Sequence, residues 1–148
     1  VDADALNLLA QQPQPLATAV LTPHPGEAAR LLGVDAAAIQ RDRFAAAQAL
    51  GERFSAVVVL KGAGTVVAAP GQRPRVIAAG NPGMAVGGMG DLLTGVIAAL
   101  LAQGLSPFDA ASTGALLHGL AGDAAAADGQ RGMLPRDLLP HLRARANP

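Results

Sequence analysis

The amino-acid sequence predicts an α/β layered fold, with a largely parallel central sheet flanked by helices and one antiparallel pair of strands. Two observations lead to this prediction. Short apolar runs such as residues 56–60 alternate with longer segments whose apolar residues recur at helical spacing. A continuous β-branched run is also typical of a strand that is buried on both faces, as in a sheet covered by helices on each side.

Length and composition limit the class of protein. The 148 residues suffice for one domain, and the 11 basic and 11 acidic residues give no net charge and no basic cluster. We therefore expect neither nucleic-acid nor membrane binding, since the apolar runs fall well short of the roughly 20 residues of a membrane span. The absence of cysteine excludes disulfides and thiolate metal sites. With no signal-peptide pattern, the simplest expected location is the cytoplasm.

The first residues combine a strand end with two carboxylates. Val1 is expected to end a buried strand, and on its continuation Asp2 and Asp4 would face a ligand crevice. Alternatively, one of these aspartates caps a helix over residues 5–11. Because a parallel strand needs neighbours on both sides, we expect the chain to be the C-terminal part of a larger domain.

A short strand over residues 18–21 leads into the segment TPHPGE. The prolines on either side of His24 make a rigid turn into a helix over residues 27–32, so His24 is well placed to meet a ligand. Glu27 has two interpretations. It is either a first-turn charge that stabilises its helix, or a metal ligand together with His24, although no third ligand is evident.

One amphipathic helix is expected over residues 35–51, with the charged residues 41–43 on its solvated face. The buried strand over residues 56–60 follows. It ends in the sequence KGAGT, where a lysine before two glycines offers an ammonium group and backbone N–H groups to phosphates. A plain hairpin turn has the same pattern, and the P-loop pattern is absent. Strands over residues 65–69 and 75–79 come next.

The sequence GNPGMAVGGMGDLLTGVIAALLAQG, residues 80–104, joins a glycine-rich loop directly to an apolar helical pattern. Free N–H groups at a helix start, together with the helix dipole, favour anions, and Gly87, Gly88 and Gly90 let the backbone approach a ligand closely. Asp91 would repel an anion unless it faced a proton-bearing group or a cation. We interpret it as the acceptor of a proton from a substrate hydroxyl in phosphoryl transfer; the alternative is a turn with a first-turn charge.

The C-terminal part is helical. Ser106 and Pro107 predict the start of a helix that extends to about Ala127 and is rich in small residues. Such residues allow close packing against another subunit, and we expect a homo-oligomer. His118 on this helix is interpreted as structural, and a last polar helix is expected over residues 136–145.

Five segments in this order resemble the ADP-dependent NAD(P)H-hydrate dehydratase family of the ribokinase-like superfamily: VDADALN, TPHPGEAARLLG, VVVLKGAGTVVAAP, GNPGMAVGGMGD and GALLHGLAGDAA. The resemblance implies that ADP phosphorylates the hydroxyl of the S form of hydrated NADH or NADPH. Elimination of phosphate then restores the nicotinamide, and AMP is released. It also implies that residues 1–148 are the C-terminal portion of one such domain, which in bacteria is often fused behind an epimerase domain.

The resemblance also assigns roles to individual residues. Asp91 matches the catalytic aspartate that faces the hydroxyl of the hydrate, and His24 matches a hydrate-binding residue. Glu27 matches a glutamate linked to Mg²⁺ through water, so that Mg²⁺ is implied as cofactor beside ADP as co-substrate. The other matches are the nucleotide-binding residues Lys61, Gly62, Ala63, Gly64, Thr65 and Gly90, and the anion hole of Gly87, Gly88 and Gly90.

Two other functions stay open. A ribokinase-like kinase of a small alcohol or vitamin precursor would use the same loop and aspartate, but would leave a stable phosphate ester. A non-catalytic nucleotide-binding module would bind AMP or ADP, and an Asp91→Asn change would leave its behaviour untouched. The HPGE and KGAGT motifs favour the dehydratase.

Overall fold

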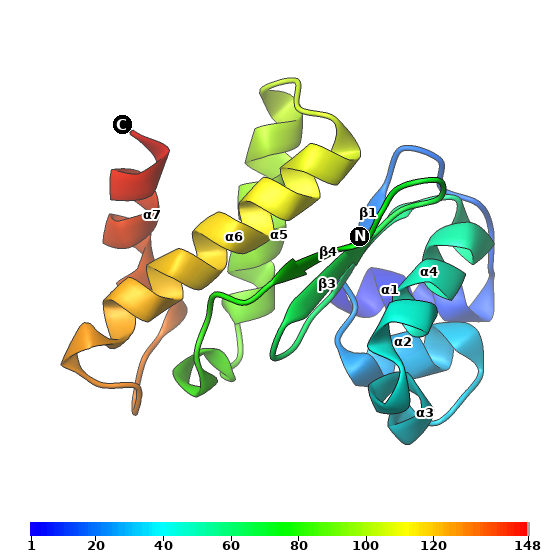
Figure 1. The fold of residues 1–148 in the computed structure, drawn as a ribbon, viewed down its shortest axis with the longest axis horizontal. Coiled ribbons are helices and arrows are strands. Elements are labelled where there is room, and N and C mark those ends of the chain that lie inside the picture. The colour runs from blue at the N-terminus through cyan, green and yellow to red at the C-terminus, as the bar shows by residue number, and fades with distance from the viewer. Residues whose placement is uncertain (148) are drawn as a thin grey trace.

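A small mixed sheet lies between two groups of helices in the computed structural model, which describes residues 1–147 (Figure 1). The N-terminal helices cover one face of the sheet, and the C-terminal helices cover the other. The helices are α1 (Ala3–Gln11), α2 (Pro25–Leu32), α3 (Ala36–Arg41), α4 (Arg43–Phe54), α5 (Met89–Ala102), α6 (Pro107–Ala125) and α7 (Leu139–Ala146). The strands are β1 (Val20–Leu21), β2 (Val57–Leu60), β3 (Thr65–Ala68) and β4 (Arg75–Ile77), and short 3-10 turns span Pro82–Met84, Ala126–Asp128 and Pro135–Leu138.

The strands lie in the order β1-β2-β3-β4, and only β1 and β2 are parallel. The predicted α/β class is confirmed, whereas a largely parallel sheet with one antiparallel pair is wrong for the described strands. The links after β2 and β3 are too short for the crossover that a parallel neighbour requires. Val1 lies beside β1, because its N donates to the Val20 carbonyl at 2.8 Å and its carbonyl accepts from Thr22 N at 3.0 Å.

Strand β2 is buried along its whole length, as its β-branched sequence predicts. Successive side chains point to opposite faces. Val58 and Leu60 pack with apolar residues of α1 to α4, while Val57 and Val59 pack with α5 and α6. The sheet thus separates two hydrophobic clusters, and the carboxyl end of β2 emerges between two layers of helices.

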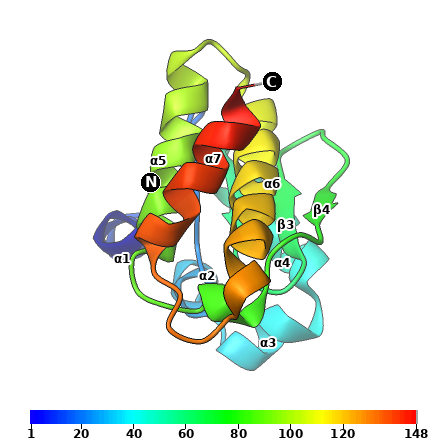
Figure 2. The same cartoon turned by 90° about the vertical axis from the view of Figure 1, so that its left-hand side faces the viewer.

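The C-terminal helix α7 lies on the outer side of α5 and α6, away from the sheet (Figure 2). A third cluster beneath it contains Met89, Ala121, Met133 and Leu138. The last helix was expected over residues 136–145; it begins at Leu139, after a 3-10 turn at Pro135–Leu138. No helix within residues 1–147 has the length and apolar character that crossing a bilayer requires.

The helix expected over residues 35–51 is in fact two helices that meet at Asp42. The Asp42 carboxylate accepts from Ala45 N at 2.9 Å and so caps α4. The expected solvated face over residues 41–43 is wrong for Arg43. Its guanidinium turns inward and donates to the backbone carbonyl of Leu60 at 3.0 Å.

Candidate functional site

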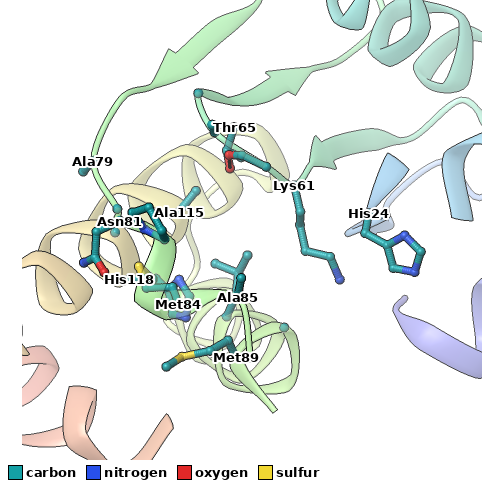
Figure 3. A pocket seen from close by; sticks show the side chains of 18 of the residues that line it. His24, Lys61, Thr65, Ala79, Asn81, Met84, Ala85, Met89, Ala115 and His118 are labelled. Carbon is teal, nitrogen blue, oxygen red and sulfur yellow. Dashed lines mark hydrogen bonds between the residues drawn. The ribbon is translucent and has the colours of Figure 1, made fainter. Parts of the chain in front are cut away.

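A cavity of about 780 Å³ opens at the carboxyl end of β2, between α2, the start of α5 and the middle of α6. Figure 3 shows Lys61 and His24 on one side of this space and His118 on the opposite side. Two segments form much of its wall. We call residues 61–65 the hairpin loop, because they join β2 to β3, and residues 80–90 the glycine loop.

All five residues of the hairpin loop line the cavity. Thr65 Oγ1 donates to the Gly62 carbonyl at 3.1 Å and closes the turn. Within residues 1–147, the N–H groups of Gly62, Ala63 and Gly64 donate no hydrogen bond to the protein. Successive free N–H groups in a turn form a donor surface suited to anions. The loop is thus the hairpin turn of the alternative interpretation and also an open set of donors; its contact with a nucleotide stays a prediction.

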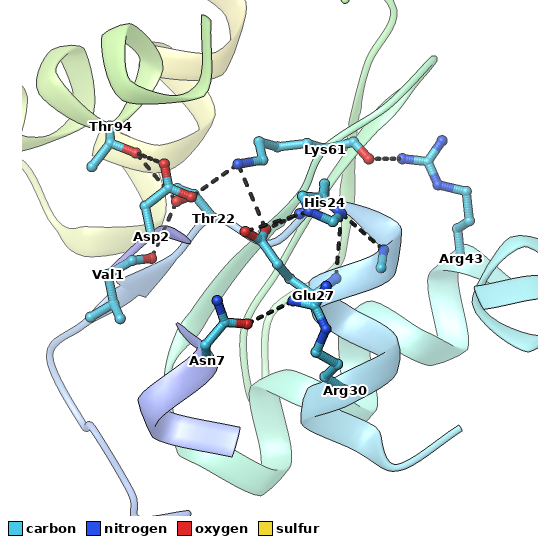
Figure 4. A network of polar contacts seen from close by, with 11 residues as sticks. Val1, Asp2, Asn7, Thr22, His24, Glu27, Arg30, Arg43, Lys61 and Thr94 are labelled. Atoms are coloured by element: carbon cyan, nitrogen blue, oxygen red, sulfur yellow. Dashed lines mark hydrogen bonds and ion pairs between the residues drawn. The ribbon is translucent and has the colours of Figure 1, made fainter. Parts of the chain in front are cut away.

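Lys61 is held beside the cavity by carboxylates. Its Nζ lies 2.9 Å from Asp2 Oδ1 and 3.9 Å from Glu27 Oε2 (Figure 4). The side chain also crosses the start of α5, since a Cβ added to Gly90 would stand 3.0 Å from Nζ and 3.5 Å from Asp2 Oδ2. A Cβ at position 90 would therefore fit only if the Lys61 ammonium moved by a few tenths of an ångström.

Asp2 is the centre of a polar network that joins three distant parts of the chain. It accepts from Lys61 Nζ and, at 2.9 Å, from Thr94 Oγ1, which lies 3.3 Å from Thr22 Oγ1. Burial opposes ionisation of Asp2, but the Lys61 ammonium and the two threonine hydroxyls outweigh it and hold its pKa below the usual value. Asp2 precedes α1 without capping it, whereas Asp4 is an exposed residue of the first turn.

His24 and Glu27 form the cap of α2. His24 Nδ1 accepts from Gly26 N at 3.0 Å and from Glu27 N at 3.3 Å, while Glu27 Oε2 accepts from His24 N at 2.7 Å. An Nδ1 that accepts leaves the proton of the neutral ring on Nε2, and Nε2 lies 3.5 Å from Glu27 Oε1. Half of the His24 side chain is exposed, and His24 lines the cavity; its contact with a hydrate stays a prediction.

Glu27 does not belong to a preformed metal site. Its side chain is only 8 % exposed, and both oxygens face the groups that cap α2 or the Lys61 ammonium. Within residues 1–147, no three side chains of histidine, aspartate or glutamate gather where they could hold a metal ion. The structure favours the first interpretation of Glu27, a charge that stabilises the first turn of its helix.

The start of α5 is an open helix terminus. Gly88 precedes it with φ of 89°, a left-handed conformation that glycine adopts without strain. The first N–H groups of a helix have no partner within it, and within residues 1–147 those of Gly90 and Asp91 have none elsewhere. Gly90 lines the cavity; Gly87, Gly88 and Asp91 are exposed and lie outside its lining. Asp91 follows a lining residue without lining the cavity itself, and its catalytic role stays a prediction.

Sequence reasoning did not single out the contacts that hold the glycine loop. Asp123 on α6 accepts from Gly80 N at 2.9 Å and from Asn81 Nδ2 at 3.1 Å. His118, interpreted as structural, lines the cavity, and its buried Nε2 has no partner within residues 1–147. Burial lowers the pKa of His118, opposed by a backbone hydrogen bond at Met89. No local pattern marks Asp123, since its partners lie more than 40 positions away.

Two glycines of α6 pack against Met84 in the middle of the glycine loop and against Ala79 directly before it. The Met84 side chain packs directly against Gly122, where an added Cβ would overlap the sulfur and stand 2.7 Å from Cε. A Cβ on Gly119 would likewise stand 2.7 Å from the Ala79 carbonyl oxygen. Small residues of α6 therefore let the loop that leads to α5 lie against the helix.

An α/β layered fold with a cavity walled by free N–H groups at the end of a buried strand defines a candidate small-molecule enzyme or binding protein of the anion-recognising type. A family model described as NAD(P)H-hydrate dehydratase matches residues 1–143. The chain belongs to this family, which confirms the resemblance predicted from the motifs.

Curated relatives and solved structures agree. The chain is 57% identical over 148 residues to the bifunctional NAD(P)H-hydrate repair enzyme of Escherichia coli, covering 99% of this chain and 29% of that protein. It is 46% identical to the ADP-dependent (S)-NAD(P)H-hydrate dehydratase of Neisseria meningitidis, covering 97% and 51%. The ADP/ATP-dependent NAD(P)H-hydrate dehydratase of Bacillus subtilis, co-crystallised with ATP and Mg²⁺, superposes with a TM-score of 0.80 at 33% identity, covering 84% and 46%. The chain thus spans at most about half the length of these relatives.

Proposed function

We propose that the protein containing this chain dehydrates the S form of hydrated NADH or NADPH with ADP as co-substrate, releasing AMP and phosphate. The observation that carries the proposal is the cavity between the hairpin loop and the start of α5, into which both segments bring backbone donors. Two sets of donors across one space suit the phosphate groups of a nucleotide and a phosphoryl group in transfer. The names of the relatives supply the substrate class.

The hairpin loop is proposed to hold the phosphate of the AMP portion through the N–H groups of Gly62, Ala63 and Gly64. The anion hole is assigned to Gly87, Gly88 and Gly90, where the N-terminus of α5 adds a positive potential. The Lys61 ammonium lies beside Gly90, paired with the Asp2 carboxylate, and offers donors rather than an uncompensated charge. These groups would stabilise the charge that develops on the phosphoryl oxygens.

Asp91 is proposed as the acceptor of the hydroxyl proton. It occupies the first turn of α5, beside Gly90, and its carboxylate has no hydrogen-bond or ion-pair partner within residues 1–147. An exposed carboxylate without a protein partner can accept a proton from a substrate hydroxyl. His24, which is half exposed and lines the cavity, is proposed to contact the hydrate.

Mg²⁺ is proposed to enter with the nucleotide. The residues of this chain do not fit a dedicated metal site, because Glu27 is engaged in the helix cap and no cluster of ligands surrounds it within residues 1–147. Mg²⁺ commonly binds through substrate phosphates and water with few protein ligands. The metal would therefore arrive as part of a magnesium–nucleotide substrate, and Glu27 would serve to orient His24.

The test is turnover of the S form of hydrated NADPH by the full-length gene product with ADP and Mg²⁺. Recovery of the near-ultraviolet absorbance of reduced nicotinamide reports the reaction, and AMP and phosphate are quantified at the end. We expect recovery that depends on ADP or ATP. A folded protein that gives no recovery with either nucleotide contradicts the proposal, and a stable phosphate ester among the products would identify a kinase instead.

A further inference from the structure

The backbone N–H groups and the backbone carbonyls of the hairpin loop differ in their hydrogen bonding. Within residues 1–147, the N–H groups of Gly62, Ala63 and Gly64 are free. By contrast, backbone carbonyls of the same turn are hydrogen-bonded. The Gly62 carbonyl accepts from Thr65 Oγ1, and three others accept from a single side chain of α4, Arg43.

Arg43 reaches the loop from the first turn of α4. Its Nη2 donates to the Leu60 carbonyl at 3.0 Å and to the Lys61 carbonyl at 3.2 Å. Its Nη1 donates to the Ala63 carbonyl. Figure 4 shows the guanidinium on the α4 side of the loop, facing the Lys61 carbonyl, while the Lys61 side chain extends away from it. One planar group thus binds three oxygens of the turn at once.

Gly62 packs closely against the guanidinium of Arg43. Gly62 has φ of 141°, and a Cβ there would stand 3.0 Å from Nη2 and 3.3 Å from both Cζ and Nη1. The glycine therefore permits both the backbone conformation and the close approach of the guanidinium. Asp42 caps α4 directly before Arg43 and fixes the point from which the side chain extends.

The consequence is electrostatic. A carbonyl oxygen directed at a phosphate would repel it, whereas an N–H group attracts it. Because Arg43 engages the carbonyls of Leu60, Lys61 and Ala63, and Thr65 engages that of Gly62, these four oxygens are not left to repel a phosphate beside the free N–H groups. An arginine can do this and a lysine cannot, since only the planar guanidinium carries several donors in fixed directions.

We propose that Arg43 is a positioning residue for nucleotide binding, which orders the hairpin loop so that its N–H groups receive an anionic phosphate. Arg43 itself touches neither nucleotide nor hydrate. The proposal rests on the proposed function only for the identity of the nucleotide, and its test can be separated from the dehydratase reaction.

The first test compares Arg43→Gln and Arg43→Lys with Arg53→Gln in the full-length protein. Arg53 lies in the last turn of the same helix, is exposed and stacks on the Phe54 ring, whereas Arg43 begins that helix. Calorimetric titration with AMP, well below the Tm of each variant, measures the Kd, and steady-state kinetics separate the KM for ADP from the KM for the hydrate.

We expect both Arg43 variants to raise the Kd for AMP and the KM for ADP by at least about tenfold, corresponding to about 1.4 kcal/mol. The KM for the hydrate should stay within about twofold, and Arg53→Gln should match the wild type. A purely structural role would lower the Tm without this selective loss. An AMP affinity within about twofold of the wild type in folded Arg43→Gln, or full rescue by lysine, overturns the proposal.

The second test uses the wild type and so does not depend on a variant that folds. Amide chemical shifts are followed during titration with AMP, with inorganic phosphate as a second probe. We expect the largest shifts at Gly62, Ala63 and Gly64; unchanged shifts at these amides while others respond overturn the proposal. AMP binding that needs Arg43 in a protein without dehydratase turnover would contradict the proposed function alone. Turnover with an unchanged KM for ADP in Arg43→Gln would contradict this inference alone.

Discussion

The hairpin loop and the glycine loop border the same cavity, yet they are held in different ways. The hairpin loop is bound by the guanidinium of Arg43, and its lysine lies in a half-buried ion pair with Asp2. The glycine loop is held at its start by Asp123, which is exposed, and residues 86–88, directly before α5, are exposed as well. A segment with few buried contacts has lower local stability.

This difference suggests that the hairpin loop and the glycine loop act on different parts of the ligand. Under the proposed function, the fixed donors of the hairpin loop would bind the part of the ligand that stays the same through the reaction, the phosphate of AMP. The glycine loop and the adjoining Asp91 would follow the phosphoryl group as its geometry changes. Variants in each loop should therefore differ in which step they affect and in how much.

The largest effect is expected for Asp91→Asn, directly after the glycine loop. The amide cannot accept the hydroxyl proton, so kcat for the hydrate should fall by at least about a hundredfold, while the Kd for AMP stays within about twofold. Asp4→Asn is the matched control, because Asp4 is also an exposed first-turn aspartate. Turnover of the Asp91 variant within about threefold of the wild type would remove this residue from the reaction.

The contact between Gly90 of the glycine loop and Lys61 of the hairpin loop is tested by Gly90→Ala. The new Cβ would stand 3.0 Å from Lys61 Nζ, so the ammonium would have to shift within its ion pair with Asp2. We expect kcat/KM to fall by at least about tenfold. Gly95→Ala is the control on the same helix: its Cβ meets nothing within 4 Å, so activity should persist and stability should rise by about 0.5–1 kcal/mol. Equal activity in both variants would contradict the packing argument.

The ion pair between Asp2 and Lys61 of the hairpin loop predicts that the stability of the protein depends on pH. The pKa of Asp2 is lowered in the folded protein, so its carboxylate contributes stability above about pH 5, and this contribution is lost as the pH falls below the unfolded value of about 3.9. Asp2→Asn should lower the free energy of unfolding by about 1–3 kcal/mol at neutral pH, with a smaller difference from wild type near about pH 3. Urea denaturation at both pH values measures this.

The control for that experiment is Glu52→Gln, which changes an exposed carboxylate of α4 that makes no hydrogen bond through its side chain within residues 1–147. Its unfolding free energy should follow the wild type at every pH. A difference between Asp2→Asn and wild type that stays constant from neutral pH down to about pH 3 would show that the Asp2 carboxylate does not stabilise the fold through its charge.

The smallest effect is expected for Asp123→Asn, which weakens the attachment of the glycine loop. The exposed carboxylate contributes hydrogen bonds to Gly80 and Asn81 that water can partly replace, so stability should fall by about 0.5–1.5 kcal/mol and AMP affinity by about two- to fivefold. Asp128→Asn is the exposed control. A loss of AMP affinity as large as that expected for Arg43→Gln would show that the hairpin loop and the glycine loop are equally ordered.

Local signals predicted much of this architecture. The β-branched run at Val57–Leu60 marked a strand buried on both faces, the prolines around His24 marked the start of α2, and Ser106 marked the start of α6, where it accepts from Asp109 N at 3.2 Å. Each signal depends on residues within a few positions, so the sequence displays it directly. The same applies to the glycines before α5.

The parts that sequence reasoning missed depend on distant partners. Arg43 binds carbonyls 17 to 20 positions away, and Asp2 accepts from Thr94 across 92 positions. Neither contact leaves a periodic trace, so Arg43 was placed on a solvated face. The break at Asp42 was missed because the apolar spacing continues across it, and the second antiparallel pair was missed because a strand's partner is set by the length of the link before it.

The contact between Met84 and Gly122 has a consequence for how the sequence can diverge. A residue with a Cβ at position 122 needs either a displaced or a shorter side chain at position 84, and a shorter side chain there leaves a void unless position 122 fills it. The two positions, one in the loop before α5 and one on α6, are therefore expected to vary together. Substitutions in the glycine loop are therefore expected to occur together with substitutions in α6.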